Sequence, residues 1–356
     1  MNLRRASGAL PYVKHAAASA LCIVVTALFA SAARAQSSVT LYGVVDVGIQ
    51  YRTNEDGQHS AVNLQNYGMI PSQIGLKGTE DLGGGLQAIF RVEQGFNVND
   101  GTPTVPGYEF WRSAYVGLTG NFGTVTFGRQ FSVLFEETLF YDPLYYGGYS
   151  GQGVLVPLSA NWIESAVKFR TVEYAGFSGE ALAATGGVAG NTRSGRVLEI
   201  GAQYLGSRFG VSGVLHQAWG NDVAGDDTSS QQQVVGTLAA HWTIGTLSLY
   251  GGAERQTGSL EPSKTVAWGG ARYQVAPSFG LAGGVYHTWS NTPSVGHPTL
   301  FIANGTYALS KHTTAYLNLA YSLNSAHSSQ TVYEYDFASL DGASQFGAMA
   351  GICHTF

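Results

Sequence analysis

The stretch VTLYGVVDVGIQY, residues 39–51, decides the fold because its side chains alternate in character along the chain. One face carries Val39, Leu41, Gly43, Val45, Val47, Ile49 and Tyr51. The other face is more polar and includes Asp46. A period of two is typical of a β-strand with one apolar face, and segments 86–96 and 234–242 repeat it without any helical spacing. The sequence therefore predicts an all-β protein.

Three consecutive glycines, Gly83–Gly85, lie between two such alternating segments. A glycine-rich loop that cradles a phosphate needs a helix after it, so that the amides of the helix N-terminus face the ligand. The residues after Gly85 alternate with period two instead. We therefore interpret the glycines as a tight turn that needs positive φ angles, between a strand that ends near Gly78 and one that starts at Leu86.

The first 35 residues have the features of an export signal. A basic start is followed by an apolar run of 15 residues at 16–30 and by the small-x-small site Ala33-Arg34-Ala35. A membrane-spanning helix needs about 20 apolar residues, so this run is too short for one. We predict that residues 1–35 are a cleaved signal peptide and that residues 36–356 form one barrel domain.

The composition of the mature chain argues against several protein classes. Only Cys353 remains after cleavage, so no intrachain disulfide is possible. Without Arg4, Arg5, Lys14 and Arg34, the 18 basic residues fall to 14 against 23 acids, a net charge of −9. A chain of this charge without a basic patch is not expected to bind nucleic acid. Neither a disulfide-stapled secreted domain nor a typical charged soluble enzyme fits the 48 glycines and 12% charged residues of the full sequence.

Short and long links alternate between the predicted strands, and aromatic residues gather beside the short links. The leading aromatics are Tyr174, Tyr204, Trp242, Tyr273 and Tyr307. Their spacing of 30 to 38 residues is about that of two membrane-spanning strands with a turn and a loop. A soluble β-sandwich is the alternative, but it does not explain the export signal or this alternation. A sheet can span a bilayer only when it closes into a barrel, and we count about 16 candidate strands.

Five ordered motifs run through the whole mature chain. They are SSVTLYGVVDVGIQY (37–51), GLKGTEDLGGGLQAIF (75–90), RSAYVGLTGNFGTVTFGRQ (112–130), YALSKHTTAY (307–316) and the terminal GICHTF (351–356). In these motifs the chain resembles the trimeric general porins of Gram-negative outer membranes, most closely their betaproteobacterial branch. The resemblance implies a 16-stranded antiparallel barrel with short periplasmic turns, long external loops and a third loop folded into the lumen. It also implies an outer-membrane homotrimer that passes ions and small hydrophilic solutes by diffusion.

The resemblance also indicates where the pore narrows. The long connection from Phe131 to Asn161 corresponds to the third loop, whose carboxylates face basic residues of the wall in similar porins. The acidic candidates are Glu136, Glu137 and Asp142. The basic candidates are Arg112, Lys77, Arg91, Arg129 and Lys168. Strand parity favours the lumen for Lys77 and Arg91, but it leaves Arg112 and Arg129 ambiguous because apolar residues share their phase.

Some positions depart from the family pattern. Gln73 stands where the family usually has an arginine, as do His312 and Cys353, and Glu164 adds an acid near the predicted wall. Together with the net charge of −9, these losses lead to the hypothesis of weak anion preference or a tilt toward cations.

The C-terminal Phe356 ends a stripe of alternate residues that is expected to face the membrane. In porin-like proteins this end is recognised by the barrel assembly machinery. The alternative is that Phe356 only packs against the end of a strand. The outer face is expected to contact outer-membrane lipid and lipopolysaccharide.

Three other functions are alternatives to a general diffusion channel. An enzyme is not expected, since the sequence contains no Gly-x-Ser-x-Gly elbow and its histidines are too scattered for a metal set; no cofactor is expected either. A substrate-specific channel is the closer rival, and Tyr141, Tyr145, Tyr146 and Tyr149 could line its passage. A recognition barrel would use long external loops such as 221–233 and 290–299.

Overall fold

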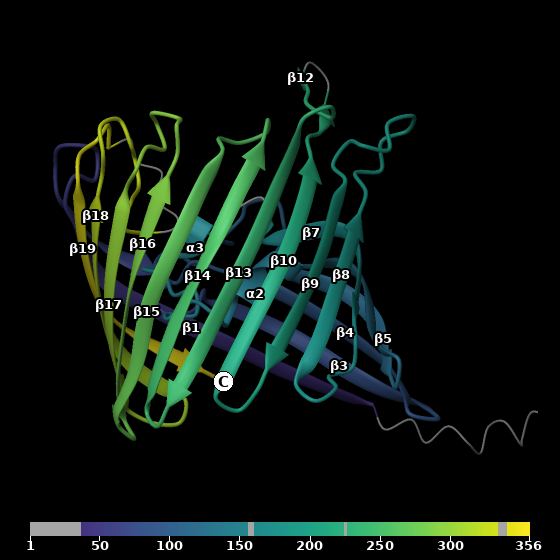
Figure 1. The fold of residues 1–356 in the computed structure, drawn as a ribbon. Coiled ribbons are helices and arrows are strands. Elements are labelled where there is room, and N and C mark those ends of the chain that lie inside the picture. The colour runs from purple at the N-terminus through teal and green to yellow at the C-terminus, as the bar shows by residue number, and fades with distance from the viewer. Residues whose placement is uncertain (1–36, 156–159, 224–225, 334–339) are drawn as a thin grey trace, which may run out of the picture.

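Strands of one antiparallel sheet wrap around and close on themselves, so that the described part of the chain forms a barrel (Figure 1). The computed structural model describes residues 37–155, 160–223, 226–333 and 340–356. The predicted signal peptide, residues 1–35, lies outside the described residues. Within them, no helix is both long and apolar enough to cross a membrane.

The first half of the barrel is built from the following strands: β1 (Ser38–Arg52), β2 (Ala61–Asn66), β3 (Gln73–Gly83), β4 (Leu86–Gly95), β5 (Ser113–Gly120), β6 (Gly123–Phe131), β7 (Trp162–Arg170), β8 (Phe177–Ala184) and β9 (Val197–Leu205). The second half comprises β10 (Phe209–Trp219), β13 (Gln232–Ile244), β14 (Leu247–Gly258), β15 (Lys264–Ala276), β16 (Phe279–Trp289), β17 (Thr299–Ala308), β18 (Thr313–Leu323) and β19 (Gln345–Thr355). A separate two-stranded hairpin, β11 (Asp222–Val223) and β12 (Asp226–Asp227), extends one external connection.

These 17 strands make a 16-stranded barrel because β2 and β3 are two parts of one interrupted strand. Both pair antiparallel with β1, β2 along its second half and β3 along its first half. The predicted all-β, 16-stranded antiparallel barrel is confirmed.

The first and last strands close the barrel. β1 pairs with β19 from Val44 opposite Thr355 to Arg52 opposite Gly347. Beyond the Val44–Thr355 pair, Gly43 and Phe356 exchange two backbone hydrogen bonds of 3.0 Å. Closure leaves the barrel sheet of the described residues without an unpaired edge, which explains how this sheet is stable although its cysteine, Cys353, is free.

The interruption between β2 and β3 is a segment that turns into the barrel, residues 67–72, called here the inner segment. The buried carboxylate of Asp46 on β1 accepts hydrogen bonds from the backbone amides of Met69 at 2.7 Å and Ile70 at 2.9 Å. It also accepts one from the Tyr316 hydroxyl on β18 at 2.6 Å. The single acid of the opening stretch therefore fixes an inward fold of the neighbouring strand.

The glycine run forms the predicted turn. Gly83, Gly84 and Gly85 have φ angles of +86°, +63° and +80°, and a Cβ at any of them would meet nothing within 4 Å. Backbone conformation rather than close packing therefore explains these glycines. The strand before the turn is longer than expected, since β3 continues past Gly78 to Gly83 with a register shift after Asp81.

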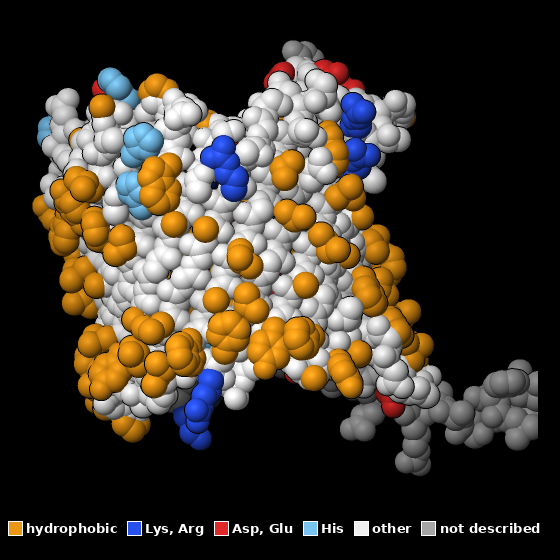
Figure 2. All heavy atoms as spheres, viewed as in Figure 1, with side chains coloured by type: hydrophobic (Ala, Val, Ile, Leu, Met, Phe, Trp, Pro, Cys, Tyr) orange, Lys and Arg blue, Asp and Glu red, His pale blue; other side chains and the backbone are white. Residues whose placement is uncertain are grey.

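The two faces of the strands differ as the alternation predicts. Along β1, Val39, Leu41 and Ile49 are 57–65% exposed, whereas Asp46 and Gln50 are fully buried. Figure 2 shows hydrophobic side chains across the outer face, with a dense band near the short turns. Exposed aromatics beside these turns include Tyr174, Phe177, Phe209, Trp242, Tyr273 and Tyr307. An apolar outer face with aromatics near its edge fits a lipid environment.

Candidate functional site

The described part of the connection between β6 and β7, residues 132–155 and 160–161, folds into the barrel and is called here the third loop. Its helix α2 (Val133–Leu139) lies against β9, β10 and β13, and a short helix α3 (Gln152–Leu155) follows. The indole Nε1 of Trp268 on β15 donates to the carbonyl of Tyr141 at 3.0 Å. The predicted inward third loop is therefore confirmed, and it lies along one side of the lumen.

The start of α2 is fixed to the wall by acceptors. The Ser132 hydroxyl accepts from the amide of Phe135 at 2.9 Å, and Glu199 on β9 accepts from the amide of Val133 at 2.8 Å. A carboxylate is favourable there because a helix N-terminus has free N–H groups and a partial positive charge. The other carboxylate oxygen of Glu199, Oε1, lies 2.7 Å from Nδ1 of His216.

The carboxylate of Glu137 points to the wall and not to the open passage. It is 1% exposed, and its Oε2 accepts a hydrogen bond of 2.8 Å from the hydroxyl of Ser212 on β10. Its Oε1 has no hydrogen-bond partner among the described residues. Burial raises the pKa of the Glu137 carboxyl above its ordinary value.

Asp142 is also turned away from the passage. Its fully buried carboxylate accepts hydrogen bonds from the hydroxyl of Tyr286 and from the amides of Leu144 and Tyr146, the latter two at 2.9 and 3.0 Å. Burial raises the pKa of this carboxyl as well. Two of the three predicted pore acids thus hold the third loop in place.

A cavity of about 610 Å³ remains between the third loop, the inner segment and the opposite wall. Four arginines line it from the wall: Arg91, Arg112, Arg170 and Arg272. Glu136 is the only carboxylate among the described residues that line it. Glu136 pairs with Lys168 on β7 at 2.6 Å. The structure therefore brings together Arg91, Arg112, Lys168 and Glu136 of the predicted set.

Strand parity leaves the direction of the Arg112 side chain ambiguous. The parity does not apply to it, because β5 begins one residue later at Ser113 and Arg112 lies outside the strand. Its guanidinium is surrounded by the rings of Trp111, Phe131 and Trp162 at 5.4–5.7 Å. Arg112 is 5% exposed. Its charge thus lies in a low-dielectric setting at the edge of the cavity, where a charge acts over a longer distance than in water.

Lys77 lies on the lumen side, as parity predicts, but it does not line this cavity. Its Nζ lies 5.3 Å from the centre of the Tyr42 ring, and the guanidinium of Arg91 lies 5.4 Å from the same ring. Lys77 and Arg91 also face each other across the β3–β4 pair. Lys77 therefore extends the basic wall beyond the cavity.

Arg129 belongs to a different place. It pairs with Glu164 and lies 5.2 Å from the ring centre of Tyr108, close to a register shift between Gly128 and Gln130. It is absent from the residues that line the cavity. The arginine and the extra acid noted in the sequence thus pair with each other and do not line this cavity.

Sequence reasoning missed Arg170, Arg272 and the inner segment. Arg170 follows Lys168 by two positions and so shares its face; it pairs with Glu180 at 3.0 Å. Arg272 shares a face with Trp268 on β15, and its guanidinium lies 4.1 Å from the Tyr145 ring centre. Parity could have identified both arginines. The inner segment had only Pro71 as a break signal.

The four tyrosines of the third loop separate into two groups. Tyr141, Tyr146 and Tyr149 are at most 2% exposed, whereas Tyr145 is 44% exposed and lines the cavity. Three tyrosines therefore anchor the loop, and one is available to a solute.

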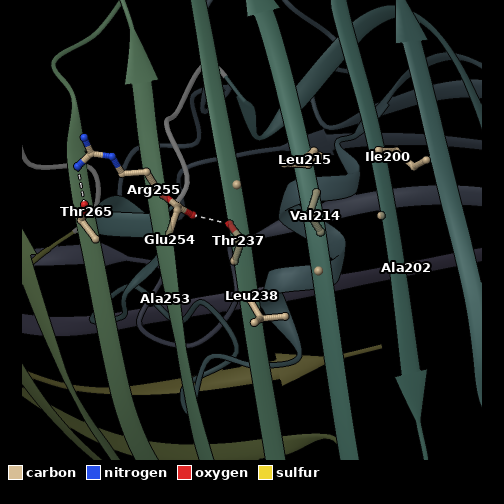
Figure 3. Close-up of a pocket in the computed structure, with 13 residues that line it drawn as sticks. Ile200, Ala202, Val214, Leu215, Thr237, Leu238, Ala253, Glu254, Arg255 and Thr265 are labelled. Carbon is tan, nitrogen blue, oxygen red and sulfur yellow. Dashed lines mark hydrogen bonds between the residues drawn. The ribbon is translucent and has the colours of Figure 1, made fainter.

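A second depression lies on the outer face and is separate from the passage. Figure 3 shows Ile200, Leu215 and Leu238 around it, on β9, β10 and β13. These three side chains are 59–64% exposed. At its edge Arg255 donates to the Thr265 hydroxyl at 2.6 Å. The neighbouring Glu254 points the other way and accepts from Thr237 at 2.9 Å, so adjacent residues of β14 serve opposite faces.

Among the described residues, no three histidine, cysteine, aspartate or glutamate side chains gather in an arrangement that could hold a metal ion. The buried histidine His216 is held by Glu199 instead.

Relatives of the chain are outer-membrane porins. An outer membrane porin protein of Bordetella pertussis is 37% identical over 174 residues, which are 44% of this chain and 45% of that protein. The chain thus matches about half or less of the length of the first curated relatives. An anion-selective porin from Comamonas acidovorans has a similar structure, with a TM-score of 0.79 and 25% identity over 90% of this chain and 100% of that one. A Vibrio cholerae outer membrane protein, OmpT in its trimer form, shares the fold at a TM-score of 0.67 and 15% identity, over 90% and 99% of the two chains.

The family model described as Gram-negative porin matches residues 17–327. This match spans most of the chain and agrees with the closed 16-stranded barrel and its inward third loop. It also agrees with the predictions of an outer-membrane location and of no enzyme activity. The chain belongs to the Gram-negative porin family.

Proposed function

We propose that this porin is a general diffusion channel that passes small hydrophilic solutes and prefers anions. The observation that carries the proposal is the set of charges at the third loop. Arg91, Arg112, Arg170 and Arg272 line the cavity, and the single lining carboxylate, Glu136, is already paired with Lys168. Rings and clusters of charge at a constriction decide which ions pass.

Basic residues still outnumber acids when the carboxylates that pair with them are included. Lys77 and Lys168 add to the four arginines, and three carboxylates pair with members of this group: Glu93, Glu136 and Glu180. With Arg112 left out and all three carboxylates ionised, five basic residues face three acids, so two positive charges are in excess among the described residues. This excess favours anions, whereas the hypothesis from the sequence, which rested on the missing arginines and the mature net charge of −9, was weak anion preference or a tilt toward cations. The name of the Comamonas acidovorans relative, an anion-selective porin, lends support.

Reversal potentials in a salt gradient test the ion preference. The protein in a planar bilayer is expected to give a potential of the sign that chloride permeation produces. A potential of the opposite sign would show that potassium passes more easily, and the proposal would then be wrong.

Liposome swelling tests the general-diffusion part. Rates for uncharged sugars are expected to fall smoothly with solute size, because no built site for a sugar is needed. Saturation by one sugar would instead indicate a specific site.

Export, assembly and partners belong to the same proposal. We infer cleavage after Ala35, insertion by the barrel assembly machinery that reads Phe356, and a homotrimer in contact with lipopolysaccharide. The exposed ring of Phe356 and its backbone pairing with Gly43 support a role for this end in closing the barrel. Deleting Phe356 is expected to lower the amount of heat-resistant trimer in membranes. Unchanged assembly would contradict the role of Phe356 but not the channel.

A further inference from the structure

The cavity at the third loop has an apolar side, which the third loop and the inner segment form. Phe140 and Tyr145 of the third loop and Ile70 of the inner segment line it and are 47%, 44% and 39% exposed. Leu139 and Leu144 border it as well. Large exposed apolar side chains on this barrel otherwise belong mainly to the outer face, so their presence inside a water-filled passage needs a reason.

The apolar side follows from the way the third loop is attached. Glu137 and Asp142 turn to the wall, where they accept hydrogen bonds from Ser212 and Tyr286. The opposite side of the same stretch then presents Phe140 and Tyr145 to the cavity. The turn has a backbone conformation that residues other than glycine rarely adopt, since Tyr145 and Tyr146 have φ angles of 51° and 58°.

Cationic and aromatic groups meet directly at one point of the cavity. The guanidinium of Arg272 lies 4.1 Å from the Tyr145 ring centre and donates to the carbonyl of Pro143 at 3.2 Å. The Tyr145 hydroxyl lies 3.3 Å from that of Tyr250. These contacts fix a flat ring and a positive charge side by side. A solute with a carboxylate and an aromatic body would match both.

We propose that the cavity selects small aromatic carboxylates over other anions of the same charge. The inference rests on the proposed function and names the solute class that its constriction favours. The carboxylate pairs with an arginine fork, for which guanidinium geometry is suited. The aromatic body lies against Phe140 and Tyr145. A cavity of 610 Å³ is large enough for one such molecule and stays open for passage.

Three probes separate the two halves of the site: benzoate, acetate and benzamide. Acetate has the charge without the ring, and benzamide has the ring without the charge. Each is added to the protein in a planar bilayer, and the reduction of the chloride current is measured. Benzoate is expected to reduce the current at a concentration about fivefold lower than acetate, the size of effect that one aromatic contact gives. Benzamide is expected to have little effect.

Matched substitutions locate the ring site. Phe140→Ser removes an aromatic side chain from the cavity. Phe110→Ser removes one of equal exposure, 47%, which belongs to the β4–β5 connection and does not itself line the cavity. Phe140→Ser is expected to bring the benzoate effect close to that of acetate. Phe110→Ser is expected to keep the wild-type difference. Arg272→Gln is expected to weaken both benzoate and acetate.

The outcomes distinguish this inference from the proposed function. If benzoate and acetate act equally on the wild type while chloride remains preferred, the aromatic site is wrong and the anion channel stands. If benzamide acts as strongly as benzoate, the carboxylate is not read and the inference is also wrong. If chloride is not preferred over potassium, the proposed function fails together with it. The wild-type comparison decides even if a variant does not assemble.

Discussion

The third loop and the wall opposite it use their charged residues in opposite ways. On the loop, Glu137 and Asp142 are buried and accept hydrogen bonds that attach the loop. On the wall, Arg91 and Arg170 keep 32% and 50% of their side chains exposed and line open cavity. These charged residues therefore have a structural effect on the loop and an electrostatic effect on the wall.

The difference has a cause in the backbone. Strands of the wall satisfy each other's N–H and C=O groups, so their side chains are free to face the lumen. A loop inside the barrel has no such ladder, and its unpaired amides need acceptors. Glu199 serves the start of α2, and Asp142 serves the amides of Leu144 and Tyr146. Carboxylates of both the loop and the wall thus supply the acceptors that hold the loop inward.

The largest expected effect comes from removing a loop carboxylate. Asp142→Ala leaves the hydroxyl of Tyr286 and two amides without their acceptor. Each buried donor left unpaired costs about 1–3 kcal/mol, so the attached loop is expected to lose about 3 kcal/mol or more. The expected readouts are a noisier single-channel current and faster chymotrypsin cleavage within the third loop.

Asp142→Asn is the control for that prediction, since its amide oxygen still accepts and its charge is gone. It is expected to lie between the wild type and Asp142→Ala. A quiet current and wild-type cleavage in Asp142→Ala would mean that other contacts hold the loop, and the contrast between loop and wall would lose its basis.

A pH change tests the same contrast between loop and wall through the protonation of Glu137. Burial raises the pKa of this carboxyl in the attached loop above its ordinary 4.5, so the attached state binds a proton more readily than the detached one. Attachment is therefore weaker above the raised pKa and strengthens as the pH falls toward 4.5. The slope is at most about 1.4 kcal/mol per pH unit for one proton.

Single-channel noise between pH 8 and pH 5 measures this effect, with less noise expected at lower pH. Glu137→Gln keeps the shape without a titrating group, and it is expected to remove the contribution of Glu137. Noise that increases on acidification would indicate that the charged carboxylate is the better anchor.

A smaller change is expected from neutralising one wall residue. Arg91→Gln removes a charge from the cavity and leaves the loop attachments untouched. A unit charge at roughly 8 Å changes the energy of a passing ion by about 1 kcal/mol after screening by salt. The permeability ratio of chloride to potassium is therefore expected to fall about fivefold. An unchanged ratio would show that Arg91 does not contribute to the field in the passage.

The sequence was sufficient for the strands and for part of the wall. Alternation depends on neighbours two residues apart, so it located the outer face of β1 and the lumen side of Lys77 and Arg91. The same parity also puts Arg170 on the face of Lys168 and Arg272 on the face of Trp268, so both arginines can be identified from the sequence. The inner segment depends on a hydrogen bond between Asp46 and Tyr316, which are 270 residues apart, and no local pattern encodes it.

The third loop could be located but not oriented from the sequence. Its length indicated a loop with a function, but a loop has no period that gives the direction of a side chain. Glu136 and Glu137 are adjacent, yet one borders the cavity and the other contacts Ser212. Only the path of α2 along the wall separates them.

The smallest effect is expected from removing a positive charge on the outer face, which serves as the control for Arg91→Gln. Arg255→Gln removes one positive charge from the chain, as Arg91→Gln does, but Arg255 lies at the edge of the outer depression beside Thr265 (Figure 3). The wall separates it from the cavity, so the chloride-to-potassium ratio is expected to stay within error of the wild type. If Arg255→Gln lowers the ratio as much as Arg91→Gln, then the net charge of the chain sets the preference. If only Arg91→Gln lowers it, the preference depends on which side of the wall the charge occupies, and the reversal potentials of these two variants decide between the two explanations.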